Sequence, residues 1–301
     1  MTDSIVSEIE ELRNRKNAVI LCHTYQNGEI QDAADFVGDS LGLSRQAADS
    51  SADLIVFCGV RFMAETAAIL NPHKKVCMPV PSAGCPMADM ADPEELARIK
   101  KQYQNVPVVC YVNSPAEIKA MSDVCVTSAN AVQIVNDISE QKIIFLPDRN
   151  LGLHVRNYTD KEIILWDGYC PVHEKIPAYC LKKAKQEHPE AAVMVHPECV
   201  PEVQQMSDHI LSTGGMCSHV SESNSMEFII GTETGIIHTL KKANPDKRFH
   251  PVTDAVCADM KKTTLQDVLE CLRNETGAVT VPSPIAEKAE TAISRMLRMS
   301  R

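Results

Sequence analysis

The stretch NAVILCHTYQNGEIQDAADFVGDS, residues 17–40, recurs in altered form twice more along the chain. The related stretches are VPVVCYVNSPAEIKAMSDVCVTS at residues 106–128 and AAVMVHPECVPEVQQMSDHILST at residues 191–213. Each begins with a short apolar run that is typical of a buried strand and continues into an amphipathic helical segment. Strands that alternate with helices predict a parallel sheet with helices on both faces. We therefore expect an α/β protein.

Polar landmarks follow the three apolar runs at nearly constant offsets. The runs end at His23, Tyr111 and His196. Twelve residues later comes an aspartate and five residues after that a hydroxyl, which gives Asp35 and Ser40, Asp123 and Ser128, and Asp208 and Thr213. A second apolar run and then a cysteine complete each unit, the cysteines being Cys85, Cys170 and Cys257. Five landmarks in one order, recurring every 85–88 residues or so, predict a threefold internal repeat.

The repeat predicts three homologous α/β/α sandwich units with parallel sheets, arranged about a pseudo-threefold axis. Units of this size bury little surface alone, so we expect them to pack on one another. The expected division is residues 1–100, 101–187 and 188–275 for the three repeats. Residues 276–301 are expected to form a closing helix that packs onto the first repeat. We expect the three recurring aspartates to be structural.

Charge and composition exclude several functions. The chain has 301 residues and a formal net charge of −10. Nucleic acids require basic patches, so neither a nucleic acid nor a membrane surface is an expected partner. The N-terminal segment lacks the apolar core of a signal peptide, and no apolar run approaches the roughly 20 residues that span a bilayer. We expect a cytoplasmic protein.

Twelve cysteines are many for a cytoplasmic chain of this length. Several lie inside apolar runs, among them Cys22, Cys58 and Cys110, where free cysteine is commonly a core residue. Cys271 is expected to pack in the core from an amphipathic helix. No C-x-x-C is present, which weakens a zinc-ribbon or thioredoxin-like interpretation and predicts no redox switch of that kind. The ligands of any bound metal must therefore lie far from one another in the sequence.

The repeat places polar side chains where a ligand site is expected. Ligands bind beyond the carboxyl ends of the strands in open parallel sheets, which is where the three apolar runs end. The three hydroxyls precede helical segments and are expected to be N-caps, where free N–H groups and the helix dipole favour anions. Three such helix N-termini around one axis predict a pocket for a small, multiply charged substrate.

The three repeat cysteines have loop-like surroundings: PSAGCPM, WDGYCPV and TDAVCADM. Equivalent loops around an axis could bring Cys85, Cys170 and Cys257 together. Three thiolates can hold a [4Fe-4S] cluster and leave one iron without a protein ligand, which makes that iron a Lewis acid. A zinc ion bound by the same three thiolates and one water is an alternative interpretation of these residues.

Dispersed motifs carry a resemblance to a known family. They are HTYQNGEIQDAADFVGDSL, FMAETAAIL, YVNSPAEIKAMSD with TSANA, LPDRNLG, WDGYCPVHE, HPEC, STGGM, IIGTETG and CADMK. Over nearly its whole length the chain resembles the quinolinate synthase family. The resemblance implies three homologous α/β/α domains around a [4Fe-4S] cluster held by Cys85, Cys170 and Cys257. It also implies a transferase that condenses iminoaspartate with dihydroxyacetone phosphate to quinolinate, phosphate and two waters in de novo NAD biosynthesis.

The resemblance also implies roles for individual residues. The substrate-binding positions that match are His23, Ser40, Tyr111, Asn113, Ser128, His196, Glu198 and Thr213. The expected catalytic residues, which would transfer protons, are Tyr25, His196 and Glu198. We expect the carboxylates of iminoaspartate to contact Tyr111, Asn113, Ser128 and Thr213. We expect the phosphate to lie near His23 and Ser40.

Two alternatives from other classes are open. An iron–sulfur sensor would normally carry a partner domain such as a basic DNA-binding helix, and the sequence has no basic run of that kind. A zinc hydrolase could use the same three cysteines, and metal analysis would separate it from a cluster enzyme. Because iminoaspartate hydrolyses, we also expect transient contact with the enzyme that produces it.

Overall fold

Three four-stranded parallel sheets form at the repeated apolar runs. The computed structural model describes residues 2–300. The first sheet, in the order β2-β1-β3-β4, contains β1 (Ala18–His23), β2 (Phe36–Gly38), β3 (Leu54–Cys58) and β4 (Lys75–Cys77). The second, β6-β5-β7-β8, contains β5 (Val108–Tyr111), β6 (Val124–Val126), β7 (Lys142–Leu146) and β8 (Glu162–Leu165). The third, β10-β9-β11-β12, contains β9 (Ala192–Val195), β10 (His209–Ile210), β11 (Glu227–Gly231) and β12 (Arg248–Pro251).

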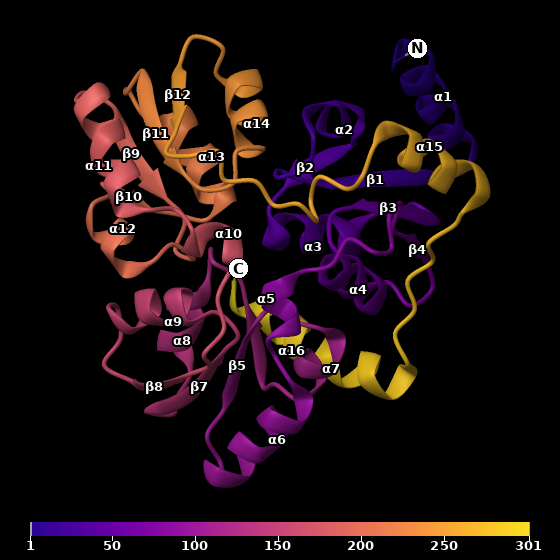
Figure 1. The fold of residues 1–301 in the computed structure, drawn as a ribbon. Coiled ribbons are helices and arrows are strands. Elements are labelled where there is room, and N and C mark those ends of the chain that lie inside the picture. Colours follow the sequence, from indigo (N-terminus) through magenta and orange to yellow (C-terminus); the bar gives the residue numbers. More distant parts are fainter. Residues whose placement is uncertain (1, 301) are drawn as a thin grey trace.

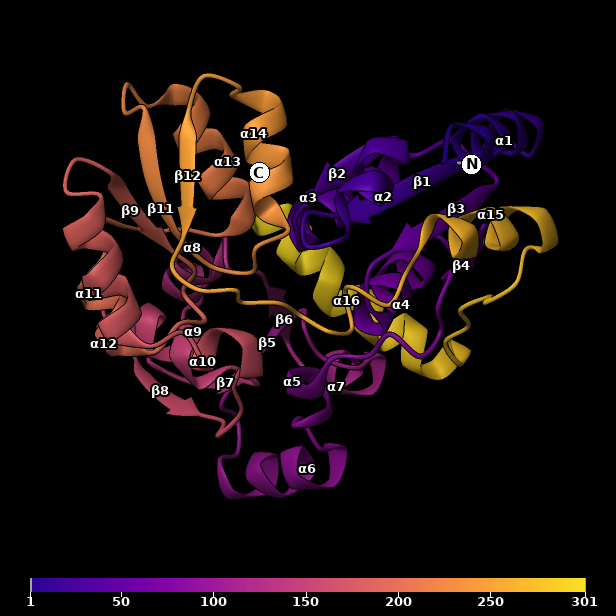
Figure 2. The same ribbon diagram turned by 45° about the horizontal axis from the view of Figure 1, so that its top comes forward.

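Every strand pair is parallel, and the order of the strands is the same in the three sheets. This confirms the predicted α/β class and the threefold repeat. Figures 1 and 2 show the sheets as three lobes around a common centre, which we call the first, second and third lobe in chain order.

Helices flank the three sheets (Figure 1). The helices of the segment that forms the first sheet are α1 (Thr2–Arg15), α2 (Gly28–Ala33), α3 (Ser40–Asp49) and α4 (Arg61–Leu70). They are followed along the chain by α5 (Pro86–Asp89) and α6 (Pro93–Gln102). The next are α7 (Ala116–Ala120), α8 (Ala131–Asp137), α9 (Arg149–Arg156), α10 (Pro171–Glu174) and α11 (Ala178–Glu187). The last are α12 (Pro201–Gln205), α13 (Thr213–Glu222), α14 (Ile236–Ala243), α15 (Leu265–Asn274) and α16 (Ser283–Met299).

The recurring aspartates stabilise the sheets by accepting hydrogen bonds from backbone N–H groups of the strands. Asp35 accepts a hydrogen bond of 2.8 Å from the backbone N–H of Ile20. The equivalent bonds, from Val108 to Asp123 and from Val193 to Asp208, are 2.7 Å and 2.8 Å long. Each carboxylate therefore satisfies an N–H group at the start of the first strand of its sheet. This confirms their structural role.

In each repeat a lysine side chain binds the C-terminal end of the equivalent helix. The ammonium groups of Lys74, Lys161 and Lys247 donate to the carbonyls of Ser50, Ile138 and Ser223, the C-cap residues of α3, α8 and α13. A cation there satisfies a free carbonyl and opposes the negative end of the helix dipole.

The central strands of the sheets are buried, and apolar side chains of the helices pack on them to complete the core. Cys22, Cys58 and Cys110 are buried within the strands, and Cys271 is buried on α15, as predicted. Burial of each large aliphatic side chain in these strands contributes about 1.5–3 kcal/mol. The apolar runs therefore hold each lobe together and leave the strand ends free for polar side chains.

The last two helices join lobes that are distant in sequence. Helix α15 packs on α1 and β3 of the first lobe. Helix α16 forms as predicted, but it packs mainly on α7 and β6 of the second lobe, and its expected contact with the first lobe, through α4, is the smaller one. No helix within residues 2–300 is long and apolar enough to cross a membrane.

Candidate functional site

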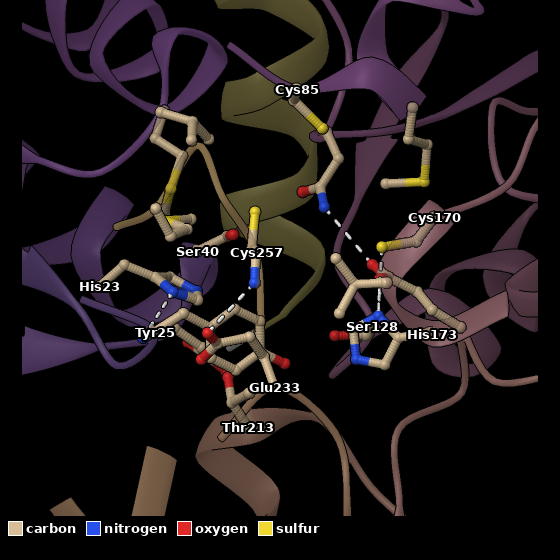
Figure 3. A pocket seen from close by; sticks show the side chains of 18 of the residues that line it. His23, Tyr25, Ser40, Cys85, Ser128, Cys170, His173, Thr213, Glu233 and Cys257 are labelled. Carbon is tan, nitrogen blue, oxygen red and sulfur yellow. Dashed lines mark hydrogen bonds and ion pairs between the residues drawn. The ribbon is translucent and has the colours of Figure 1, made fainter. Parts of the chain in front are cut away.

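One cavity lies where the three lobes meet, and all twelve predicted site residues line it (Figure 3). Its empty volume is about 680 Å³. The predicted lining residues are His23, Tyr25, Ser40, Cys85, Tyr111, Asn113, Ser128, Cys170, His196, Glu198, Thr213 and Cys257. Many of them follow the carboxyl ends of β1, β5 and β9, where ligands bind in parallel sheets. The individual roles stay predictions.

The turn after the first strand of each sheet supplies two polar side chains. The repeat-equivalent pairs are His23 and Tyr25, Tyr111 and Asn113, and His196 and Glu198. The backbone N–H of Tyr25 donates to Nδ1 of His23 at 3.1 Å, and that of Glu198 donates to Nδ1 of His196 at 3.3 Å. Because Nδ1 accepts in both histidines, a neutral ring carries its proton on Nε2.

The three hydroxyls lie at the cavity, but the prediction that they are N-caps was wrong. Asp39 caps α3 by accepting from the N–H of Gly42 at 2.9 Å. Ser212 caps α13 by accepting from the N–H of Gly215 at 3.1 Å. Ser40 and Thr213 are the first helical residues instead, and Ser128 precedes Asn130, the N-cap of α8. The hydroxyls themselves are therefore not used for capping.

Cys85, Cys170 and Cys257 come from equivalent loops of the three repeats and face the same cavity (Figure 3). Burial raises the pKa of Cys85 to about 12, and burial also raises the pKa values of Cys170 and Cys257. Binding to iron would remove these protons. Among the described residues, the three thiols do not all lie within 4.8 Å of one another, the spacing that would let them share one metal ion. The three thiols alone therefore do not form a single-ion site, and a group that all three hold must be larger than one ion. Cys170 with His173 and Glu198 does meet the single-ion spacing.

Two buried acids hold the loops that carry Cys170 and Cys257. The carboxylate of Asp148 accepts from the N–H of Cys170 at 3.2 Å through Oδ2 and from Leu151 at 2.7 Å through Oδ1. Glu233 accepts from the N–H of Cys257 at 3.3 Å through Oε1. Both acids are fully buried. They are repeat-equivalent, and both fix the backbone of a predicted cluster ligand.

Glu198 is the centre of a hydrogen-bond network that crosses the lobes. Its Oε1 accepts from the Tyr111 hydroxyl at 2.6 Å and from Nδ2 of Asn113 at 3.4 Å. Its Oε2 lies 2.8 Å from Nδ1 of His173. The other carboxamide atom, Oδ1 of Asn113, is buried without a protein partner within residues 2–300. An unpaired buried acceptor at a cavity is a position that a ligand can satisfy.

The network continues from Glu198 to Tyr25 of the first lobe. The side-chain oxygen of Thr232 lies 2.7 Å from Nε2 of His173 and 2.6 Å from the Tyr25 hydroxyl. Nδ1 of His173 is also 3.2 Å from Sγ of Cys170. A continuous chain of hydrogen-bonding groups thus links the predicted proton-transfer residues Tyr25 and Glu198 to a predicted cluster ligand.

Burial determines which of these groups carry charge. It lowers the pKa of His23 and of His196 to about 3, so both rings are neutral near pH 7. Burial alone would raise the pKa of Glu198, but His196, His173 and the Tyr111 hydrogen bond hold it well below its ordinary value. Burial and the nearby Glu198 raise the pKa of both Tyr25 and Tyr111. Glu198 is therefore ionised, whereas the hydroxyls of Tyr25 and Tyr111 keep their protons.

Three residues of the cavity network, His173, Thr232 and Glu233, were not predicted. Two of the quoted motifs, WDGYCPVHE and IIGTETG, contain them, and this was the available signal. Lys261 was also missed: its ammonium group donates to the carbonyl of Tyr25 and lies 3.0 Å from Oε1 of Glu233. These residues act across lobe boundaries, which the landmarks of one repeat do not reveal.

Comparison with known proteins places the chain in a family. The model of the family "Quinolinate synthetase A protein" matches residues 7–298. Quinolinate synthase from Dehalococcoides mccartyi (strain CBDB1) is 53% identical over 296 residues, covering 98% of each chain. Quinolinate synthase 2 from Methanosarcina acetivorans is 51% identical over 98% of this chain and 96% of its own. Quinolinate synthase from Thermodesulfovibrio yellowstonii is 50% identical over 99% of both. With this likeness along its whole length, and with a cavity lined by three cysteines from three repeats, the chain belongs to the quinolinate synthetase A family.

Proposed function

We propose that the protein is a quinolinate synthase, which condenses iminoaspartate with dihydroxyacetone phosphate to quinolinate, phosphate and two waters. The observation that carries the proposal is the meeting of Cys85, Cys170 and Cys257 with the Glu198 network in one cavity. The family and the names of its relatives support the reaction. The product would enter NAD biosynthesis, in keeping with a transferase of the cytoplasm.

Cys85, Cys170 and Cys257 would hold a [4Fe-4S] cluster. When bound, such a cluster supplies a Lewis-acidic iron that has no protein ligand. The chain's own contribution there is to position the thiols, through the hydrogen bonds that Asp148 and Glu233 accept from the backbones of Cys170 and Cys257.

The polar end of the cavity would bind the two substrates. The carboxylates of iminoaspartate can accept from the Ser128 and Thr213 hydroxyls, with Asn113 and Tyr111 beside them. The phosphate of the triose would lie near Ser40 and the Nε2–H of His23. Neutral donors in a buried cavity bind anions strongly, because little water competes for them. This arrangement suits small anionic substrates of an acidic protein.

The Glu198 network would move the protons that the condensation and the two dehydrations require. Glu198 is ionised and can accept a proton as a general base. Tyr25 is neutral and can donate one, and Thr232 and His173 connect the two residues. His196, beside Glu198, presents its Nε2–H as a further donor. Proton transfer can thus take place without bulk water.

The test is anaerobic purification followed by metal analysis and assay of quinolinate formation. We expect about four irons with sulfide per chain and activity with both substrates. Cys85→Ser, Cys170→Ser and Cys257→Ser should each lose the cluster and the activity, whereas Cys180→Ser, at a partly buried cysteine outside the cavity, should keep both. A zinc-containing, inactive wild-type protein would contradict the proposal.

We further propose transient contact with the enzyme that supplies iminoaspartate. The imine hydrolyses in water, so a short diffusion path would protect it.

The repeat boundaries proposed from the sequence, at residues 1–100, 101–187, 188–275 and 276–301, can be tested by limited proteolysis. Cleavage should be concentrated at residues near these boundaries if the units fold separately.

A further inference from the structure

A second group of metal-ligating side chains lies on the third lobe, away from the cavity. His188, Glu227 and His250 each offer one ligand atom, and these atoms all lie within 4.8 Å of one another. Nε2 of His250 is 2.7 Å from Oε1 of Glu227, and Nδ1 of His188 is 3.3 Å from the same oxygen. The three side chains therefore converge on one point.

The fold brings these residues together on β11 and β12 of the third sheet, beside the end of α11. Glu227 is the first residue of β11, and His188 follows α11 directly. His250 lies on the neighbouring edge strand β12, in register with Ile229. Side chains two apart on a strand share a face, so Glu227 projects on the same side as Ile229. Ile229 and Leu181 of α11 belong to the same buried cluster, and α11 contacts β11.

The two histidine rings stack with their centroids 3.5 Å apart and their planes inclined by 18°. The remaining nitrogens, Nε2 of His188 and Nδ1 of His250, have no protein partner within residues 2–300. Nε2 of His250 donates a hydrogen bond to Oε1 of Glu227 here. For an ion to bind, it would take the place of this proton, and each ring can then carry its single proton on the outer nitrogen.

The surroundings leave the point of convergence accessible. The side chains of His188, His250 and Glu227 are 30%, 25% and 19% exposed. Two cations lie beside the group: Arg248 contacts the other carboxylate oxygen, Oε2, at 3.3 Å, and Lys183 lines the surface hollow. Glu187 lines the same surface hollow as the two histidines. Within residues 2–300, Oε1 of Glu227 contacts only the two imidazoles, which are the other two ligands of the group, and an ion would bind between them. Glu187, the further acid, lies 3.7 Å from Lys183.

We propose that His188, Glu227 and His250 bind one divalent transition-metal ion of the class that prefers imidazole ligands, for which Zn²⁺ is the probe. Two imidazoles and a carboxylate are a well-known ligand set for zinc with open coordination positions. The ion would join the end of α11 to β11 and β12. None of the three residues lines the cavity, and the site does not depend on the reaction proposed there.

Equilibrium dialysis of the iron-loaded protein against Zn²⁺, without oxygen, tests the proposal. We expect one zinc per chain with the iron content unchanged. His188→Ala and His250→Ala should each bind zinc at least about tenfold more weakly. His209→Ala is the matched control, because His209 also packs on a second histidine, His219, with ring centroids 4.0 Å apart, but belongs to no three-ligand group among the described residues. It should keep the zinc.

Two further measurements separate the possible outcomes. Glu227→Gln preserves the shape of the site and should also weaken zinc binding, so a folding defect in an alanine variant cannot imitate the result. X-ray absorption at the zinc edge should show nitrogen and oxygen ligands at about 2.0–2.1 Å, not sulfur at about 2.3 Å. Sulfur ligation, or zinc uptake that all three variants share with the wild type, would overturn the proposal. Quinolinate formation should be unchanged in the three variants.

Discussion

The hydroxyl of Tyr111 donates a hydrogen bond of 2.6 Å to Oε1 of Glu198. Tyr111 belongs to the second lobe and Glu198 to the third. On the other side of the carboxylate, His173 and Thr232 extend the connection to Tyr25 of the first lobe. The geometry of the candidate site is therefore set by how the three lobes pack, and substitutions within this chain of contacts should affect activity more than folding.

Glu198→Gln should lower kcat by about 10²–10⁴-fold, the usual contribution of a general acid or base. The amide has nearly the same shape but cannot accept a proton, so the iron content should be unchanged. Steady-state assay of quinolinate formation with iron analysis tests this. Glu202→Gln, at an exposed position on α12, is the matched control. Wild-type activity in Glu198→Gln would exclude a proton-transfer role.

Thr232→Val should reduce kcat by about tenfold, because it removes the hydroxyl between Tyr25 and His173. Loss of such a hydrogen bond costs about 1–1.5 kcal/mol, which corresponds to roughly tenfold in rate. Thr232→Ser keeps the hydroxyl and should retain most of the activity. Equal activities in the two variants would show that the connection is not used.

Asp148→Asn and Glu233→Gln should weaken retention of the cluster. Asp148 uses both oxygens, one for Cys170 and one for Leu151, and an amide offers only one acceptor atom. We expect less iron after purification and faster bleaching of the visible absorbance in air. Asp167→Asn is the control, because that side chain is 93% exposed although it lies near Cys170 in sequence. Iron loss in Asp167→Asn equal to that in the two variants would argue against the proposed role.

Stability should rise with pH between about 3 and 6.5, because His23 and His196 are buried in the neutral form. Their folded pKa values are about 3, and an unfolded histidine titrates near 6.5. The unfolded state binds more protons in this window, so each histidine contributes a slope of up to about 1.4 kcal/mol per pH unit. Urea unfolding of the cluster-free protein at several pH values measures the slope.

His196→Asn should flatten this pH dependence, whereas His73→Asn, at an exposed position, should leave it unchanged. An identical slope in wild type and His196→Asn would show that the buried histidine is not the cause.

The spacing of polar landmarks predicted the fold class, the repeat and the convergence of nine residues on one cavity, because each landmark occupies the same place in each parallel sheet. Tyr25, Asn113 and Glu198 were predicted only through the family resemblance. It did not predict His173 or Thr232, whose partners lie on other lobes. A signal for Asp148 and Glu233 existed, since both lie two residues after equivalent positions of β7 and β11. Val60 occupies that place in the first repeat and hides the pattern.

Other differences have local causes. The helix starts were misplaced because Asp39 and Ser212, adjacent to the marked hydroxyls, are equally good capping residues. The amphipathic pattern of the last segment correctly predicted a helix. The pattern does not indicate, however, on which lobe the apolar face of that helix packs. Helix α16 covers the second lobe more than the first.

The common strand order of the three sheets also bears on the origin of the protein. Duplication and fusion of one ancestral gene would produce such an arrangement, and the unfused ancestor would be a homotrimer with three identical side chains at each place now held by Tyr25, Asn113 and Glu198. A trimer of that kind can offer only symmetric surroundings to its ligand. Three copies joined in one polypeptide can each diverge, which would allow a phenol, an amide and a carboxylate to occupy the three repeat-equivalent places.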